Sequence, residues 1–204
     1  ISLQMDKLAA TARMLATSSR ILTVDFCDVA MTEQVAGQIA GMQRIDVLVH
    51  CAGVLSTGPV AEVPPAELAR VHTVNFLGPS RLTQAALPAL ERSQGQIVFM
   101  NSSAAVRPSP GLSSYASSKA ALAAYANVLR DEVNPRGIRV VNVFPGRTAT
   151  PMQAAMFRAE GRDYHPEHLL QPEDVAAMVV GALELPRTAE VTDLHIRPMK
   201  KSPA

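Results

Sequence analysis

The sequence is short of net charge, of long apolar runs and of metal ligands, and each shortage excludes a class of protein. Its 19 basic and 18 acidic residues nearly cancel, so no broad field favours nucleic acid or an anionic membrane surface. No apolar run reaches the roughly 18 residues that a membrane-spanning helix needs. His165 and His168 have no further ligands at metal-site spacing, and they predict surface residues. We therefore expect a protein without nucleic-acid, membrane or metal partners.

Cysteine is also scarce, with Cys27 and Cys51 alone in the chain. Each thiol stands at the end of an apolar, strand-like run. This placement predicts two buried thiols in a reducing compartment rather than a disulfide, and hence a cytoplasmic protein.

What the chain does have is apolar material in strand-length pieces. Of its 204 residues 48% are hydrophobic and 18% charged, enough for one globular domain spanning 1–204. The predicted strands lie at 20–26, 44–54, 95–102, 138–146 and 191–196, and segments with helical periodicity lie at 5–17, 30–42, 64–92, 114–134 and 172–184. Four of the strands are rich in valine and isoleucine without polar alternation, which is typical of strands buried on both faces. The pattern predicts a doubly wound parallel α/β sheet, Rossmann-like, with ligands beyond the carboxyl ends of its strands.

Local signals mark some helix ends. Pro172 followed by Glu173 and Asp174 predicts a helix start, and Ser113 and Ser114 are possible caps for the helix at 114–134.

Gly78 and Pro79 interrupt the helical pattern of 64–92. Proline lacks an N–H, so Pro79 leaves the carbonyl of Asn75 without its helical partner, at a cost of about 3 kcal/mol. Either one helix ends at Gly78 and another starts at Pro79, or the free carbonyl of Asn75 serves a purpose.

One constellation carries chemistry. Tyr115 and Lys119 are four residues apart at the start of a helix, so they share a face about 5–6 Å apart at Cβ. An ammonium that close is expected to lower the tyrosine pKa from about 10. Ser102 ends a predicted strand 13 residues earlier, where a hydroxyl could reach the same substrate oxygen, and its neighbour Ser103 is an alternative. A hydroxyl that only satisfies loop backbone is the structural alternative for either serine.

These residues resemble the short-chain dehydrogenase/reductase family, and the match runs in order through nearly the whole chain. The motifs are "VDFCDV", similar to the acidic turn after the family's third strand, "VHCAGV", similar to the stretch after its fourth strand, and then "VNFLGP", "MNSSAA", "YASSK" and "FPGRTATPM". The resemblance implies an NAD- or NADP-dependent oxidoreductase that interconverts an alcohol and a carbonyl by hydride transfer.

The resemblance also implies roles for the residues in these motifs. Tyr115 would be the general acid and base, Ser102 would hydrogen-bond the substrate oxygen, and Lys119 would hold the nicotinamide ribose. The backbone carbonyl of Asn75 would position a water that links Lys119 to solvent. The residues expected along the cofactor are Asp25 and Phe26 near the adenine, then Cys51, Ala52 and Gly53, then Pro145, Gly146, Thr148 and Thr150 around the carboxamide, besides Tyr115 and Lys119.

The chain departs from the family pattern in three places. His50 and Cys51 replace the usual pair of asparagines, which removes a hydrogen bond between neighbouring strands. Arg147 is unusual for a loop facing nicotinamide, and it either points to solvent or meets an anionic group. The Thr-Gly-x-x-x-Gly-x-Gly turn that cradles the pyrophosphate does not occur in the sequence. We therefore expect a β-α-β unit of some 30 to 40 further residues upstream, and the residues that choose between NAD and NADP lie in that unit.

Other functions fit less well. A non-catalytic relative with the same fold, acting as a regulator or binding module, has no need of serine, tyrosine, lysine and Asn75 together. The extended branch of sugar-nucleotide epimerases needs a larger substrate domain than the 58 residues after Gly146, and a serine hydrolase needs a Gly-x-Ser-x-Gly elbow, which the sequence lacks.

The substrate is a small molecule of unspecified identity. The loop at 151–171 is expected to cover the pocket, where Met152, Met156 and Phe157 either suit an apolar compound or pack on the sheet. Alanines along 114–134 and the family resemblance imply a homodimer or homotetramer through this helix and the Pro79 helix.

Overall fold

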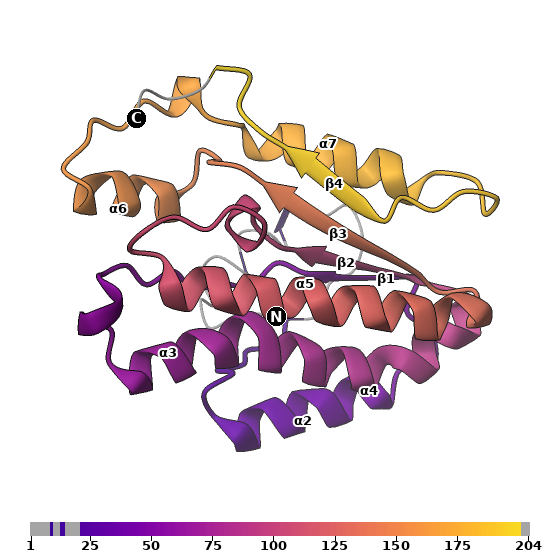
Figure 1. The fold of residues 1–204 in the computed structure, drawn as a ribbon. Coiled ribbons are helices and arrows are strands. Elements are labelled where there is room, and N and C mark those ends of the chain that lie inside the picture. Colours follow the sequence, from indigo (N-terminus) through magenta and orange to yellow (C-terminus); the bar gives the residue numbers. More distant parts are fainter. Residues whose placement is uncertain (1–8, 10–12, 15–20, 201–204) are drawn as a thin grey trace.

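The computed structural model describes residues 9, 13–14 and 21–200, and a parallel sheet lies at its centre (Figure 1). The four strands are neighbours in chain order: β1 (Val47–His50), β2 (Gln96–Met100), β3 (Arg139–Pro145) and β4 (Asp193–Ile196). All three pairings are parallel, with Val49 opposite Val98 and Val98 opposite Val141. The predicted class, a parallel α/β sheet of Rossmann type, is confirmed.

Helices cover both faces of the sheet (Figure 1). On one face lie α5 (Ser113–Val133), α4 (Gly78–Ser93) and α3 (Pro65–His72), with α2 (Val29–Ala40) packed against α4; on the other face lies α7 (Pro172–Leu183), and α6 (Pro151–Ala159) lies beyond the carboxyl end of β3. Short helical turns occur at Val60–Glu62, Ser103–Ala105, Asn134–Arg136 and Pro166–His168. None of the helices in the described part of the chain is long and apolar enough to cross a membrane.

The hydrophobic core has two parts, one on each face of the sheet, because successive side chains of a strand point to opposite faces. Ile97 and Phe99 of β2 point to the side of α4 and α5, whereas Val98 between them packs with Val175 of α7. Successive side chains of a strand point to opposite faces, so a strand covered on both sides must be apolar throughout. This is why the unbroken valine and isoleucine runs predicted these strands.

One predicted helix start is confirmed, and two predictions about helix boundaries need correction. The helix α7 begins at Pro172, as the sequence predicted, and the Asp174 carboxylate accepts from the Gln171 N–H at 3.0 Å. The expected serine caps of α5 are wrong: the cap position is Leu112, whose carbonyl accepts from Ala116 N at 2.7 Å, so the helix begins one residue earlier. Part of the expected loop at 151–171 is helical, because the Thr150 side chain caps α6 by accepting from the Gln153 N–H.

The helix at 64–92 does not break at Gly78. A π-helical turn (Thr73–Leu77) joins α3 to α4, and the Gly78 N–H bonds the carbonyl of Thr73. A π turn holds one extra residue, which lets the chain continue in helical conformation up to Pro79. Of the two alternatives, the one in which a helix ends at Gly78 and another starts at Pro79 is therefore wrong, and Pro79 has no N–H to donate to the Asn75 carbonyl.

The predicted strand at 20–26 is also wrong over its described residues. Residues 21–25 have no strand pairing; Val24, 3% exposed, packs in the core on the α2 and α4 side together with the partly buried Leu22 and Phe26. A strand exists only where a neighbouring backbone completes its hydrogen-bond ladder, and among the described residues the sheet begins at β1. Apolar character placed this segment in the core, but it could not supply the partner. The expected helix at 5–17 lies almost wholly outside the described residues.

His50 ties β1 to α4 and replaces the family's asparagine in a different way. Its Nε2 lies 2.8 Å from Thr83 Oγ1, and its ring stacks on Phe99 at 5.0 Å between centroids. The Thr83 hydroxyl donates to the Pro79 carbonyl, so it can only accept from an N–H of His50. Burial lowers the pKa of His50 to about 4, which keeps the ring neutral.

We expect this buried histidine to make stability depend on pH. The folded protein resists protonation of His50, whereas the unfolded chain accepts a proton near pH 6.5, so the contribution is complete above that pH and is lost as the pH falls toward 4. The loss amounts to about 3 kcal/mol at most. Urea unfolding at pH 7 and pH 4 should show a larger decrease in unfolding free energy for the natural protein than for His50→Gln. His168→Gln, at an exposed position, serves as the control and should follow the natural protein. Parallel pH dependences for the natural protein and His50→Gln would contradict the argument.

Candidate active site

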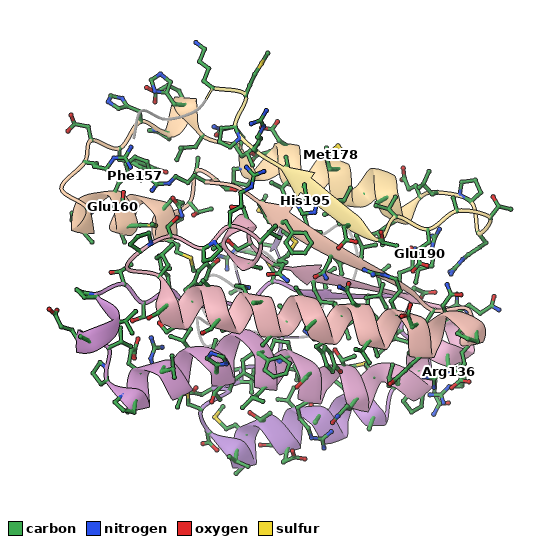
Figure 2. The ribbon with its side chains drawn as sticks, in the orientation of Figure 1. Arg136, Phe157, Glu160, Met178, Glu190 and His195 are labelled. Atoms are coloured by element: carbon green, nitrogen blue, oxygen red, sulfur yellow. The ribbon has the colours of Figure 1, made fainter. Side chains whose placement is uncertain are left out.

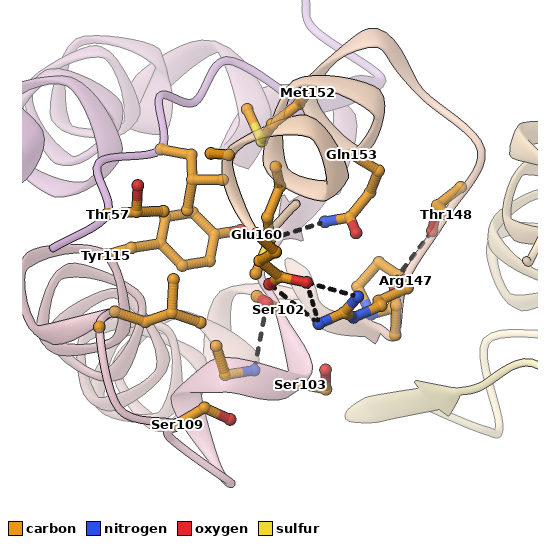
Figure 3. A pocket seen from close by; sticks show the side chains of 18 of the residues that line it. Thr57, Ser102, Ser103, Ser109, Tyr115, Arg147, Thr148, Met152, Gln153 and Glu160 are labelled. Atoms are coloured by element: carbon orange, nitrogen blue, oxygen red, sulfur yellow. Dashed lines mark hydrogen bonds and ion pairs between the residues drawn. The ribbon is translucent and has the colours of Figure 1, made fainter. Parts of the chain in front are cut away.

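A cavity of about 500 Å³ opens at the carboxyl end of the sheet (Figures 2 and 3). Figure 2 shows Phe157 and Glu160 at this end, with Arg136 and Glu190 at the opposite end of the molecule. The lining comes from the turns after β2 and β3, the start of α5, the segment after β1, and α6. Of the predicted site residues, the cavity brings together Ser102, Tyr115, Pro145, Gly146, Thr148 and Thr150.

Tyr115 and Ser102 meet in this cavity. Tyr115 is the third residue of α5, and Figure 3 shows its hydroxyl pointing into the cavity. The Ser102 hydroxyl accepts from Ala104 N at 3.1 Å, which fixes its rotamer beside the tyrosine. Burial raises the pKa of Tyr115, and a hydrogen bond with Ser102 partly opposes the rise. Ser103 also lines the cavity, but it is Ser102 that touches the phenol.

Lys119 does not act on Tyr115 in the way its spacing suggested. Its Nζ lies 5.9 Å from the centroid of the Tyr115 ring and donates to the Met100 carbonyl at 2.8 Å. The side chain is 4% exposed, and burial lowers its pKa to about 8. The expected lowering of the tyrosine pKa is therefore wrong in this structure. Four-residue spacing put the two groups on one face, but burial of the phenol outweighs the neighbouring amine.

Asn75 holds the segment after β1 against α5. Its Oδ1 accepts from the Val54 N–H at 2.8 Å, and its Nδ2 donates to the Val54 carbonyl at 2.9 Å and to Ser118 Oγ at 3.0 Å. The residue is fully buried within the π turn. The side chain thus positions the backbone next to Gly53, a role that the sequence did not indicate. The role assigned to its backbone carbonyl stays a prediction.

Gly53 leaves room beside these groups. A Cβ added there would lie 3.5 Å from Asn75 Oδ1 and 3.7 Å from Lys119 Nζ, and would occupy the space above the lysine. Cys51 and Ala52 precede it, with Cys51 exposed. The backbone here leaves space for a flat ligand, and the expected cofactor contacts of Cys51, Ala52 and Gly53 stay predictions.

The loop after β3 is held in place by hydrogen bonds to other parts of the chain. The Gly146 N–H donates to the Ile196 carbonyl at 2.7 Å, and an added Cβ would meet Pro198 at 3.1 Å. A side chain at this position would require Pro198 to shift slightly, so the packing of the C-terminal segment favours glycine. Thr148 Oγ1 donates to the Gly146 carbonyl at 3.1 Å, and Thr150 caps α6.

Asp25 and Phe26 are not among the residues that line this cavity. The Asp25 carboxylate accepts from the Cys27 N–H at 2.9 Å. The Phe26 ring fills the space over Gly78, where an added Cβ would lie 2.4 Å from the ring. This contact explains the glycine in the α4 sequence, and the expected adenine contacts of Asp25 and Phe26 stay predictions.

Sequence reasoning missed two charged residues of the cavity. Arg107 lines it from the turn after β2, and Glu160 lines it from the end of α6. Arg147 was recognised as unusual, and of its two alternatives the structure selects an anionic partner, Glu160, with the closest N to O distance at 3.2 Å. Only a fold could reveal this pair, because no helical or strand periodicity links residues 13 apart through a loop. Met152 and Met156 line the cavity, whereas Phe157 does not.

The cysteines and histidines singled out by the sequence lie elsewhere. Cys27 and Cys51 are free, as expected, but both are exposed, so the prediction of buried thiols is wrong. Each follows its apolar run at the point where the chain leaves the core. His165 and His168 are exposed as expected, and with Glu167 their ligand atoms lie within 4.8 Å of one another.

Comparisons with known proteins agree with this geometry. The profile of the family described as short chain dehydrogenase matches residues 2–161. The chain is 33% identical over 189 residues to an uncharacterized short-chain type dehydrogenase/reductase of Sinorhizobium fredii, covering 90% of this chain and 75% of that protein. It is 30% identical to a glycine betaine reductase of Emericella nidulans, over 96% of this chain but only 16% of that protein.

The fold is also similar to that of a solved structure. An Escherichia coli protein described as a short chain dehydrogenase, complexed with NADPH, superposes with a TM-score of 0.81 at 28% identity, covering 94% of this chain and 82% of that chain. Profile, relative and structure agree with one another, and the protein belongs to the short-chain dehydrogenase/reductase family of oxidoreductases.

Proposed function

We propose that the protein is an NAD- or NADP-dependent oxidoreductase that interconverts an alcohol and a carbonyl, with Tyr115 as general acid and base. One observation carries the proposal: the Tyr115 hydroxyl, beside Ser102, points into a cavity large enough for a small substrate. The alternative, a regulator without catalysis, requires no phenol and hydroxyl aimed at the same point of a cavity.

The residues present fit the nicotinamide half of the cofactor. Gly53 keeps the space beside Lys119 Nζ free of a side chain, and the buried amine can donate to a ribose hydroxyl there. The nicotinamide, when bound, supplies or accepts the hydride at the substrate carbon. The similar Escherichia coli protein is complexed with NADPH. Turnover measured separately with NADPH and with NADH decides which of the two this chain uses.

The chain's own groups handle the proton. Tyr115 donates its hydroxyl proton to the substrate carbonyl oxygen as negative charge develops on that oxygen. Ser102, whose oxygen already accepts from Ala104 N, has its O–H available to donate to the same oxygen. The Lys119 amine donates to the Met100 carbonyl at 2.8 Å and lies 5.9 Å from the centroid of the Tyr115 ring. Its pKa of about 8 lets it release or take up a proton near neutral pH.

The raised pKa of Tyr115 favours one direction near neutral pH. A phenol that keeps its proton is a general acid ready for carbonyl reduction, whereas oxidation of an alcohol requires the phenolate. We therefore propose reduction as the direction at neutral pH and oxidation at higher pH.

The test is turnover by the full-length natural protein. NADPH and NADH are each supplied with a panel of aldehydes and ketones, and consumption of the reduced cofactor is followed by absorbance. Carbonyl-dependent consumption supports the proposal. Cofactor binding without turnover across the panel would favour the regulator instead. The free, exposed thiols fit a reducing cytoplasm, and the homodimer or homotetramer implied by the resemblance stays a prediction.

Pro79 gives a second test, aimed at the carbonyl of Asn75. Replacing Pro79 by alanine restores an N–H four residues after Asn75, which can occupy that carbonyl. If the carbonyl holds a water in the proton path, the turnover of Pro79→Ala should decrease several-fold with a changed pH profile, while the Kd for the cofactor changes less. Pro88→Ala is a matched control, since Pro88 lies inside the same helix and is exposed. The same turnover at every pH for both variants would remove the carbonyl from the mechanism.

A further inference from the structure

The lining of the cavity carries an excess of positive charge. Among its lining residues Arg107 and Arg147 are basic and Glu160 alone is acidic. Arg107 is exposed and has no ion-pair partner among the described residues. In an enzyme for neutral carbonyl compounds, guanidinium groups facing the substrate have no evident use.

The Arg147 guanidinium already holds a carboxylate in a two-pronged arrangement. Its Nη1 lies 3.3 Å from Glu160 Oε2, and its Nη2 lies 3.2 Å from Oε1 (Figure 3). Well-formed pairs of this kind are shorter, about 2.7–2.9 Å. Both side chains are about 30% exposed, at 31% and 29%. The pair is therefore loose and open to exchange with another carboxylate of the same shape.

Glu160 also pairs with Arg162, and it can keep this partner when another anion binds Arg147. Arg162 Nη1 lies 3.2 Å from Glu160 Oε2. The centroid of the Phe157 ring lies 4.8 Å from the Arg147 guanidinium and 5.2 Å from that of Arg162. Cation–π contact with this ring helps to hold both guanidinium groups in place whether or not Glu160 bridges them. An incoming anion can thus displace Glu160 from Arg147 without leaving the carboxylate unpaired.

We propose that the substrate carries a carboxylate, which binds Arg147 in place of Glu160 while its carbonyl or hydroxyl group lies at Tyr115 and Ser102. The substrate class is accordingly an oxo acid and the corresponding hydroxy acid, with Arg107 adding to the attraction. The carboxylate takes no part in the bond changes: hydride and proton add to the distant carbonyl as in the proposed function, on which this inference rests. A guanidinium fork whose present occupant is a carboxylate is the chemistry that selects the acid.

The test uses matched pairs of substrates in the full-length protein. The acids 3-oxobutanoate, 4-oxopentanoate and 5-oxohexanoate are each compared with the corresponding amide, which has the same shape without the charge. The natural protein should prefer one of the acids in kcat/KM by about tenfold or more, the effect expected of a charge-assisted hydrogen-bond pair. Arg147→Gln should abolish this preference by raising KM for the acid, with little change for the amide. Glu160→Gln should lower KM for the acid several-fold, because it removes the internal competitor.

The control removes a charge without touching the cavity. Arg158 lies on the same helix as the cavity residues of α6, is exposed and does not line the cavity. Arg158→Gln should keep the preference for the acid. Equal kcat/KM for acid and amide in the natural protein, or equal losses in Arg147→Gln and Arg158→Gln, would overturn the proposal.

Failure of the subsite and failure of the oxidoreductase function are distinguishable. Turnover of the amides shows the oxidoreductase chemistry whatever the acids do. If neither series nor any compound of the aldehyde and ketone panel is reduced, the proposed function fails, and calorimetric titration with the acids decides the subsite by itself. Weaker binding to Arg147→Gln than to Arg158→Gln supports it, and equal binding or none contradicts it.

Discussion

Replacing Tyr115 by phenylalanine is expected to lower the rate of carbonyl reduction by about a hundredfold to ten-thousandfold, the usual contribution of a positioned proton donor. Only the hydroxyl is removed, and the ring keeps its place at the start of α5 under Lys119 Nζ. The fold and the binding of cofactor should therefore be preserved. The measurement is kcat for reduction, with thermal unfolding and cofactor titration to show that the variant is otherwise intact.

Tyr125 provides the matched control. It lies on the same helix, with its ring at 6.0 Å from that of Phe99 and its hydroxyl 3.5 Å from the Ser80 carbonyl, and it does not line the cavity. Tyr125→Phe should keep the activity of the natural protein within a few-fold. Equal rates for Tyr115→Phe and Tyr125→Phe would exclude Tyr115 as the proton donor.

The pH dependence of the natural enzyme should follow from the same residue. Burial raises the pKa of Tyr115, so its proton remains at neutral pH and is lost only in alkaline solution. Reduction, which uses the phenol, should be level through neutral pH and decrease in alkaline solution. Oxidation, which uses the phenolate, should increase over that range. The rates of reduction and oxidation are measured over this pH range for both proteins, and Tyr115→Phe should abolish the pH dependence.

Replacing Asn75 by leucine is expected to have the largest effect on stability. The substitution keeps the volume but removes the hydrogen bonds to the Val54 N–H and carbonyl and to Ser118, in a fully buried place. Each buried backbone group left unpaired costs about 1–3 kcal/mol, so the unfolding free energy should decrease by about 2–5 kcal/mol. Urea unfolding measures this change, and Gln84→Leu, at an exposed position of α4, is the control.

The Asn75 variant also separates two roles of one residue. Its side chain positions Val54 and the neighbouring Gly53, so Asn75→Leu should weaken cofactor binding as well as stability. Pro79→Ala acts on the backbone carbonyl of Asn75 and leaves the side-chain hydrogen bonds in place. An Asn75→Leu protein as stable as the natural one would show that the amide's hydrogen bonds are dispensable.

Local sequence was enough for features that depend on near neighbours. The β2 and β3 runs are valine-rich and apolar on both faces, and this composition alone identifies strands buried between helix layers. The start of α7 followed from Pro172 and its acidic neighbours, and the common face of Tyr115 and Lys119 followed from helical spacing. Each of these inferences uses geometry that spans a single turn or strand.

Features that depend on distant partners needed the fold. The segment at 21–25 has the composition of a strand, but pairing is a property of two backbones, and its neighbours in the structure are side chains of the core. The sign of the Tyr115 pKa shift depends on how much water burial removes and on where the Lys119 amine finds its acceptor, which is Met100. The exposure of Cys51 was decided in the same way, by what lies around the end of β1.

The sequence by itself determined that this chain is a parallel α/β protein of the short-chain dehydrogenase/reductase family, because periodicity and the order of motifs can be read along the chain. It also predicted Ser102, Tyr115 and Lys119 as the catalytic groups. Only the tertiary structure showed that burial raises the pKa of the Tyr115 phenol and that Arg147 pairs with the Glu160 carboxylate at the cavity. Burial and ion pairing are set by the groups that folding brings together, and spacing along the chain does not specify them.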